Sequence, residues 1–283
     1  MKLLRVGEKG AEKPALLHSD GTYRDLSSVV PDITGKTIDS AGLGRIKAAD
    51  PSKLPVLDGK LRIGPCVGNV GKFICVGLNY ADHAAESNMP IPSEPILFMK
   101  ATSAIIGPND TVVVPKNSTK CDWEVELGVV IGKDTRYVDE KDALSHVAGY
   151  CVINDLSERA FQKERGGQWV KGKSADTFGP IGPWLVTADE VADPQNLKMF
   201  LEVNGHRYQN GSTRTMIFGV RTLVSYISQF MSLQPGDVIS TGTPPGVGEG
   251  VKPASVFLHG GETLHLGIEG LGEQTQRTVA YSG

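Results

Sequence analysis

Long apolar runs, paired cysteines and an excess of charge of one sign are all missing from this sequence of 283 residues. No apolar run approaches the roughly 18 residues that a membrane-spanning helix needs, so we expect no membrane partner. The formal net charge is −3 and the pI is about 6.1, which predicts no basic surface for nucleic acid. The opening stretch, MKLLRVGEKG, has too short an apolar segment for a secretory signal. We therefore expect a cytoplasmic protein.

Two further absences concern chemistry. The four cysteines (Cys66, Cys75, Cys121 and Cys151) lie far apart and include no C-x-x-C pair. We interpret them as reduced residues, some of them buried, although a catalytic thiol stays open. The sequence has no G-x-x-x-x-G-K-[S/T] loop and no G-x-G-x-x-G after a predicted strand. Nucleotide binding is therefore not expected.

What is abundant is glycine (34 residues) and proline (17), which separate many short β-like runs. Examples of these runs are 111–115, 199–208, 237–241 and 263–270. Helices are expected at 80–88, 156–165 and 219–231. This pattern predicts an α+β, strand-rich fold with few helices. A change from polar sequence to the apolar KFICVGLNY predicts a small N-terminal domain, residues 1–66, and a main domain, residues 67–283.

One strand carries alternating carboxylates. In DWEVELGVVIG (122–132), the side chains of Asp122, Glu124 and Glu126 share one face and apolar residues share the other. The Cα atoms of Glu124 and Glu126 lie about 6.5–7 Å apart in a strand, so both carboxylates can reach one hard cation. A third carboxylate, Asp155, follows the apolar run AGYCVIND. A solvated acidic strand face, and a helix cap at Asp155, remain open.

Three other segments have the residue types of an active site. His83 and Glu86 are three apart, so on a helix the carboxylate can orient the imidazole as a base toward water. Lys171 and Lys173 alternate, so only one faces a given site if the segment is extended. The loop STGTPPGVG (240–248) offers hydroxyl and backbone N–H groups that can hold a carboxylate. The alternatives are a surface ion pair, two solvated lysines and a plain turn.

Taken in this order, the segments resemble the fumarylacetoacetate hydrolase family. The resemblance extends from about Lys72 to the end of the chain and depends on GLNYADHAAE, EVELGVVIG, NDLSER, KGKSADTFGP and STGTPPGVG. It implies a mixed β-roll that is often dimeric. It also implies a Mg²⁺ site, with Mn²⁺ or Ca²⁺ in some members, formed here by Glu124, Glu126 and Asp155. Asp122 matches no ligand position.

The resemblance also implies roles for residues around the metal. His83 and Glu86 match the pair that activates water, and Lys173 matches the active-site lysine. The residues expected to contact substrate are Tyr80 and Thr243, which match the family, together with Arg159 and Gln162 on the expected helix after Asp155.

The implied reaction is hydrolysis of the C3–C4 bond of a 2,4-diketo acid, which yields pyruvate and a second carboxylic acid. The metal would act as a Lewis acid toward the pyruvate enolate. The bacterial subgroup that the sequence resembles most is described as hydrolases of 2,4-diketo-3-deoxy-L-rhamnonate or L-fuconate, and also as ureidoglycolate lyases. We expect the polar stretch 207–214 to hold a hydroxylated substrate tail. A lyase or oxaloacetate decarboxylase at the same site, and a non-catalytic metal-bound protein, remain alternatives.

Overall fold

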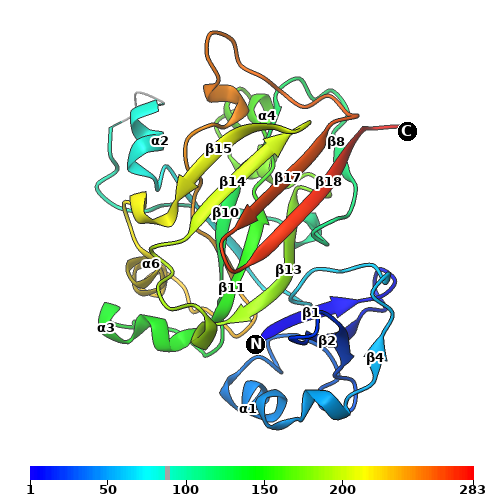
Figure 1. Ribbon diagram of the computed structural model, residues 1–283. Helices are drawn as coiled ribbons and strands as arrows, with labels where there is room; N and C mark the ends of the chain where they lie inside the picture. The colour runs from blue at the N-terminus through cyan, green and yellow to red at the C-terminus, as the bar shows by residue number, and fades with distance from the viewer. Residues whose placement is uncertain (87–89) are drawn as a thin grey trace.

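The computed structural model describes residues 1–86 and 90–283, and it is strand-rich with few helices (Figure 1). The predicted fold class is therefore confirmed. The helices are α1 (Ser40–Ala48), α2 (Ala81–Glu86), α3 (Glu140–Ala143), α4 (Arg159–Lys163), α5 (Val170–Lys173) and α6 (Val220–Ile227). No helix among the described residues is long and apolar enough to cross a membrane.

A large sheet extends through the centre of the molecule. Its strands run in the order β4 (Val56–Leu57), β3 (Tyr23–Asp25), β2 (Lys13–Leu17), β1 (Lys2–Val6), β13 (Gly179–Thr187), β11 (Val147–Asn154), β10 (Val125–Ile131), β16 (Val238–Ser240), β5 (Phe73–Gly77) and β6 (Ile96–Lys100), and β7 (Ile105–Ile106) pairs with β13. The central strands β10 and β11 are antiparallel neighbours, with Val125 opposite Asn154. This register brings Glu124 beside Asp155, whose N–H donates to the Glu124 carbonyl at 2.9 Å.

A second sheet packs across the centre of the first. Its strands are β15 (His206–Ser212), β14 (Lys198–Val203), β17 (Thr263–Ile268), β18 (Gly272–Ala280) and β8 (Val112–Val114). Figure 1 shows this sheet in front of β10, β11 and β13. Alternate residues of both sheets, such as Leu127, Leu201 and Leu266, meet in one buried apolar cluster. A two-stranded ribbon of β12 (Ser157–Glu158) and β9 (Cys121–Asp122) completes the strands.

The N-terminal residues form the blue lobe in Figure 1, which contains β1–β4 and α1. Strand β1 pairs antiparallel with β13, with Leu3 opposite Leu185. The sheet is thus continuous between the lobe and the rest of the chain. The predicted boundary after residue 66 stays a prediction.

Most of the expected elements are present, with four changes. The helix expected at 219–231 is α6, which ends at Ile227. The strand expected at 199–208 is two strands, because Asn204 and Gly205 adopt positive φ and form a tight turn between β14 and β15. The helix expected at 156–165 begins only at Arg159, because Ser157 and Glu158 pair with β9. The helix expected at 80–88 is described over Ala81–Glu86, and its last two expected residues lie outside the described part of the chain.

Candidate active site

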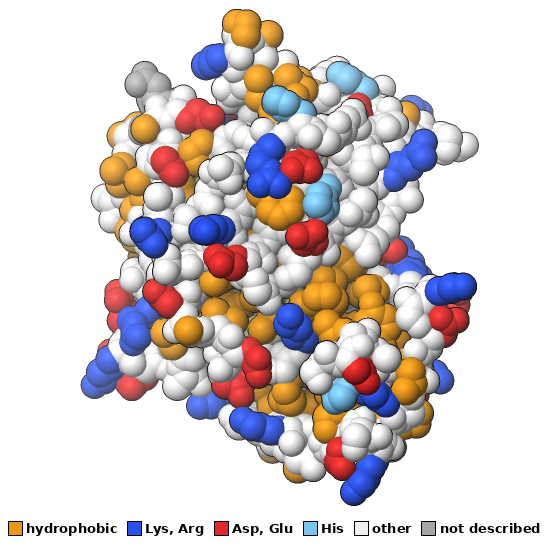
Figure 2. Space-filling view, in the orientation of Figure 1, with side chains coloured by type: hydrophobic (Ala, Val, Ile, Leu, Met, Phe, Trp, Pro, Cys, Tyr) orange, Lys and Arg blue, Asp and Glu red, His pale blue; other side chains and the backbone are white. Residues whose placement is uncertain are grey.

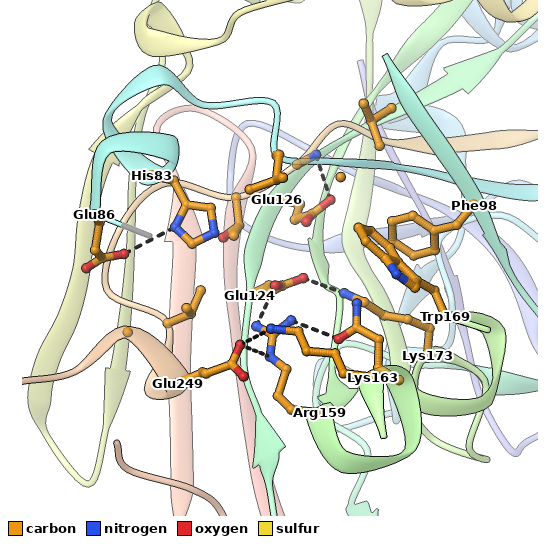
Figure 3. A pocket seen from close by; sticks show the side chains of 18 of the residues that line it. His83, Glu86, Phe98, Glu124, Glu126, Arg159, Lys163, Trp169, Lys173 and Glu249 are labelled. Atoms are coloured by element: carbon orange, nitrogen blue, oxygen red, sulfur yellow. Dashed lines mark hydrogen bonds and ion pairs between the residues drawn. The ribbon is translucent and has the colours of Figure 1, made fainter. Parts of the chain in front are cut away.

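One cavity of about 410 Å³ opens beside the start of β10 (Figure 3). Its volume falls in the usual range for a small-molecule site. The predicted site residues that line it are His83, Glu86, Glu124, Glu126, Arg159, Gln162, Lys173 and Thr243. They come from α2, the strand β10 with the residue before it, α4, α5 and the loop after β16. The fold therefore brings together residues from segments that are distant in the sequence.

The carboxylates beside β10 are enclosed by protein. Glu124, Glu126 and Asp155 are 6%, 2% and 0% exposed, so the alternative of a solvated acidic strand face is wrong. One oxygen from each lies within 4.8 Å of the others. A helix cap at Asp155 is wrong too, because Glu158 is the residue whose carboxylate caps α4, at the Ala160 N–H.

Three buried cations pair with two of these carboxylates, Glu124 and Asp155. Lys173 Nζ donates to Glu124 at 2.6 Å and to Asp155 at 2.7 Å, and Arg159 Nη2 donates to Glu124 at 2.7 Å. Lys100 donates to Asp155 and, at 2.9 Å, to the Leu156 carbonyl. Lys100 is a residue that the sequence analysis missed. Its signal is a lysine at the end of the otherwise apolar strand ILFMK (β6).

The neighbours of the two glutamates shift their acidities in opposite directions. Burial by itself raises the pKa of Glu124, but the charges of Arg159 and Lys173 outweigh burial and hold that pKa well below its usual value. Among the described residues, no cation is bonded to Glu126. Burial and the charges of Asp155 and Glu124 raise its pKa well above the usual value, even though Ser240 Oγ and the Gly242 N–H donate to it.

This donor set fits a hard divalent cation. Mg²⁺ and Mn²⁺ prefer carboxylate oxygens, and three converging carboxylates from two adjacent strands supply them. Two of the three side chains, Glu124 and Glu126, also line the cavity, so a cation held there has access to a bound molecule. A bound divalent cation would also balance the negative charge of the Glu126 carboxylate, which lacks a bonded cation among the residues described.

A histidine–carboxylate pair lies on the opposite side of the cavity. His83 Nδ1 is 3.1 Å from Glu86 Oε2, as the spacing on α2 predicts. His83 is 9% exposed, so the alternative of a surface pair is wrong for the imidazole. The hydrogen bond to His83 is the main cause that lowers the pKa of Glu86. Figure 3 shows the other ring nitrogen of His83 directed toward Glu124 and Glu126.

The far wall of the cavity is apolar, and Lys173, the predicted active-site lysine, lies against it. Phe98 and Trp169 pack edge to face with ring centroids 5.2 Å apart, and Lys173 Nζ lies 5.1 Å from the Phe98 centroid. The segment of Lys171 and Lys173 is the short helix α5, so the condition of an extended segment is not met. Only one of the two faces the site, because Lys171 is exposed and donates to the Arg165 carbonyl.

The loop at 240–248 is more than a plain turn, but it holds carboxylates of the protein itself. The Gly242 N–H donates to Glu126 at 2.8 Å. Thr243 lines the cavity, yet its hydroxyl donates to the Val125 carbonyl at 2.9 Å and accepts from Gln209 Nε2 at 2.8 Å. The loop therefore fixes the carboxylate strand.

Two expectations about substrate contacts are contradicted. Tyr80 is fully buried in the apolar core and its hydroxyl contacts Met199 Sδ at 3.3 Å, so it does not face the cavity. Among the described residues that line the cavity, none comes from 207–214. Gln209, in this stretch, bonds instead to the Val125 N–H and the Thr243 hydroxyl, behind the cavity wall. Arg214, in the same stretch, bonds to Asn196.

The cysteines are free and all buried, as their spacing suggested. Burial raises the pKa of the Cys75 and Cys121 thiols, which disfavours the thiolate that a nucleophile needs. No cysteine is among the described residues that line the cavity.

The fold is strand-rich, and its cavity is lined by buried carboxylates that could hold a metal and by a histidine. Comparison with known proteins shows which family the chain belongs to. The model of the fumarylacetoacetate (FAA) hydrolase C-terminal domain matches residues 72–279. The chain belongs to this family.

Individual relatives are similar over their whole length. A protein of Burkholderia orbicola (strain MC0-3), which bears the name "Putative hydrolase", is 66% identical over 98% of this chain and 99% of its own. Maleylpyruvate hydrolase from Sphingobium sp. SYK-6, solved with manganese(II) and pyruvate, is 29% identical with a TM-score of 0.82, covering 100% of both chains. A 2-hydroxyhepta-2,4-diene-1,7-dioate isomerase from Mycobacterium marinum is 31% identical with a TM-score of 0.74, again covering 100% of both.

Proposed function

We propose that this protein is a metal-dependent hydrolase that cleaves the C3–C4 bond of a 2,4-diketo acid to give pyruvate and a second carboxylic acid. One observation carries the proposal: a single cavity places the buried carboxylates Glu124 and Glu126 opposite the His83–Glu86 pair. Support also comes from the similar maleylpyruvate hydrolase, whose structure contains manganese(II) and pyruvate.

The metal would be held by Glu124, Glu126 and Asp155. When bound, a divalent cation supplies Lewis acidity that withdraws negative charge from the keto and carboxylate oxygens of a 2-keto acid. We propose Mg²⁺ as the native ion, with Mn²⁺ or Ca²⁺ as substitutes. The lysines that neutralise the carboxylates, Lys100 and Lys173, keep the site from being strongly negative, which suits an anionic substrate.

The protein's own side chains perform the proton transfers. With Nδ1–H donated to Glu86, His83 Nε2 has a free lone pair and removes a proton from a water molecule. That water attacks the C4 carbonyl, and the C3–C4 bond breaks with its electrons moving to the pyruvate fragment. C3 of that fragment then takes up the proton that His83 removed, which gives pyruvate and restores the neutral imidazole. The ammonium of Lys173 stabilises the negative charge that develops at that fragment. Glu86 remains ionised because its pKa is lowered, so it keeps the imidazole in the required tautomer.

For the substrate tail, we propose a hydroxylated chain, as in a 2,4-diketo-3-deoxy derivative of L-rhamnonate or L-fuconate, which yields lactate. Polar groups at the cavity wall support this choice: Gln162, Lys163, Glu249 and Lys252 all line it. They supply both donors and acceptors for hydroxyl groups. The family resemblance further supports a homodimer, which light scattering of the purified protein tests.

The experiment is the loss of ultraviolet absorbance of an enolised 2,4-diketo acid, measured after EDTA treatment with and without added Mg²⁺ or Mn²⁺. An acylpyruvate and a 2,4-diketo-3-deoxy sugar acid are the two substrates. Metal-dependent loss with stoichiometric pyruvate is expected, and a higher rate with the sugar acid supports the hydroxylated tail. No loss with either substrate contradicts the hydrolase, and oxaloacetate and ureidoglycolate then test the decarboxylase and the lyase.

A His83→Ala variant separates hydrolysis from decarboxylation at the same site. Hydrolysis needs an activated water, so we expect turnover to fall, whereas decarboxylation of a keto acid leans less on this base. Full turnover of the variant would favour the decarboxylase. Metal binding without turnover on any keto acid would favour a non-catalytic protein.

A further inference from the structure

The loop after β16 uses the backbone N–H groups of three glycines to hold three carboxylates, two from residues 122–126 and one from α2. The pairs are Gly242 with Glu126 (2.8 Å), Gly246 with Glu86 (3.2 Å) and Gly248 with Asp122 (2.6 Å). One carboxylate belongs to the proposed metal site, one orients His83, and the third has no part in the proposed chemistry. The loop therefore connects both sides of the cavity.

Glycine is required at two of these positions by close backbone contacts. Gly246 has φ +100°, and a Cβ there would lie 1.9 Å from the Tyr208 carbonyl oxygen. A Cβ at Gly248 would lie 2.1 Å from the Val256 carbonyl oxygen. A side chain would force Gly246 away from β15 and Gly248 away from the segment that contains Val256, so the absence of Cβ atoms lets the loop approach the carboxylates closely.

Asp122 holds this loop to the carboxylate strand. It is 0% exposed, and its Oδ1 accepts from the N–H of Trp123 at 2.8 Å and of Gly248 at 2.6 Å. Its Oδ2 accepts from Arg159 Nε at 2.8 Å and from the Glu249 N–H at 3.1 Å. Both oxygens are thus fully used by donors, two of them from the loop.

Asp122 is connected to both sides of the cavity, to Glu124 through Arg159 and to Glu86 through the loop. Arg159, bound to Asp122 through Nε, donates through Nη2 to the metal-site carboxylate Glu124. The loop, bound to Asp122 at Gly248, donates to Glu86 two residues earlier.

We propose that Asp122 is a positioning residue that holds Arg159 against the metal-site carboxylates and holds the 246–249 loop against Glu86, so that the two sides of the cavity keep one relative geometry. The catalytic part of this inference rests on the proposed function. The structural part does not, since it concerns only the order of the loop.

The change Asp122→Asn tests it with little change of volume. Asp122 accepts all four of its hydrogen bonds. In the Asn variant an NH2 group replaces one of the two oxygens, and in either orientation of the amide this group faces N–H donors. Either the loop or Arg159 must then lose its anchor.

Asp237→Asn is the matched control. Asp237 is 1% exposed and accepts from the N–H groups of Lys72 and Gln234, both at 2.8 Å, and it pairs with Lys72 Nζ at 2.7 Å. It does not line the cavity. This variant reports what losing a buried, backbone-bound carboxylate does to the fold in general.

Two measurements are made on both variants: hydrogen–deuterium exchange of the peptide over 244–250, and kcat and KM for the diketo acid with saturating metal. For Asp122→Asn we expect faster exchange confined to this peptide and a fall in kcat of about 10–100-fold, the usual cost of losing a supporting contact. Asp237→Asn should change neither. If Asp122→Asn changes exchange and kcat no more than the control does, the proposal is wrong.

A double variant with Glu86→Gln tests whether Asp122 acts through the loop. The loss of kcat from Asp122→Asn should be smaller in the Glu86→Gln background, since part of its effect passes through that side chain. Strictly additive losses would contradict this coupling. If the native protein turns over no diketo acid, the proposed function fails, and the exchange measurement still decides whether Asp122 holds the loop.

Discussion

Two histidine–carboxylate clusters among the described residues, one on the second sheet and one at the cavity, differ in their surroundings. On the outer face of the second sheet, His265 lies 2.8 Å from Glu273 and 3.4 Å from Glu202, which Arg207 binds at 2.7 Å. Blue, red and pale blue side chains gather over this sheet in Figure 2. At the cavity, His83 meets Glu86, and the carboxylates beyond them are enclosed. The residue types are the same, but the His265 side chain is 37% exposed and the His83 side chain only 11%, although Glu86 itself is exposed.

The difference lies in the cost of burial. Exposed ion pairs are screened by water and contribute little to stability, so the outer cluster needs no function to explain it. Buried charges cost several kcal/mol each unless they are paired, and a fold that keeps four carboxylates and three cations together in its interior does so at the expense of stability. A buried cluster of charged side chains beside a cavity therefore indicates function, and an exposed cluster does not.

The largest expected effect comes from breaking the buried pairing. Lys173→Met leaves Glu124 and Asp155 without their shared ammonium, so we expect the metal-free protein to lose about 3–5 kcal/mol of unfolding free energy. Activity should be lost as well. Lys171→Met, at an exposed lysine two residues earlier, is the control and should change neither. If both variants lose the same unfolding free energy in urea, burial does not explain a difference between the two lysines.

The next effect compares the two histidines. His83→Ala should lower kcat by about 10²–10⁴-fold, because a positioned general base contributes that much. His265→Ala removes a histidine that also has two carboxylate neighbours but lies outside the cavity of His83, and it should leave kcat unchanged. A steady-state assay of both variants decides the point. A loss of kcat in His265→Ala would mean that the outer cluster also serves the reaction.

Metal binding gives a third, smaller effect. A ligand that binds only the folded state stabilises it by about 2.7 kcal/mol at 100 times its dissociation constant, so Mn²⁺ should raise the unfolding midpoint of the EDTA-treated protein. Glu126→Gln should abolish most of this gain. Glu273→Gln, on the outer sheet, should retain it. A gain that survives Glu126→Gln would place the ion elsewhere.

The smallest effect is expected at the outer cluster itself. Arg207→Ala should shift Tm by about 2 °C or less and leave turnover unchanged. Arg207 is the main cause that lowers the pKa of Glu202, so any stabilisation from this pair is present at neutral pH and lost as pH falls through the lowered pKa. Thermal melts of the native and variant proteins at neutral and acidic pH, repeated at high salt, measure it. A large, salt-resistant change would contradict the picture of a screened pair.

Much of the site was predictable because its residues stand at characteristic local spacings. The alternation at Glu124 and Glu126 needs only a strand to put both on one face, and the spacing of His83 and Glu86 needs only one helical turn. Local rules also place the short strands, since glycine and proline end them. They fail at 199–208, where two residues with positive φ turn a predicted strand into a hairpin.

The residues that were missed or misplaced depend on contacts between distant segments. Lys100 joins the site because β6 ends beside the residues after β11, 55 positions along the chain. Tyr80 follows a site-like motif, yet the packing of the second sheet covers it completely. No local pattern records either fact, because burial is set by which sheet faces pack together.

The sequence by itself determined the types and local order of the functional groups: the strand carboxylates, the histidine–glutamate pair, the glycine loop and, through the family resemblance, the proposed ligands Glu124, Glu126 and Asp155. Only the tertiary structure decided which charges are buried together and which stay in solvent. It assigned Lys100 to the cluster, gave Asp122 to the loop and Arg159, and left His265 on the surface. The physical reason is that chemistry follows from side-chain type, whereas burial and the strength of charge interactions follow from long-range packing.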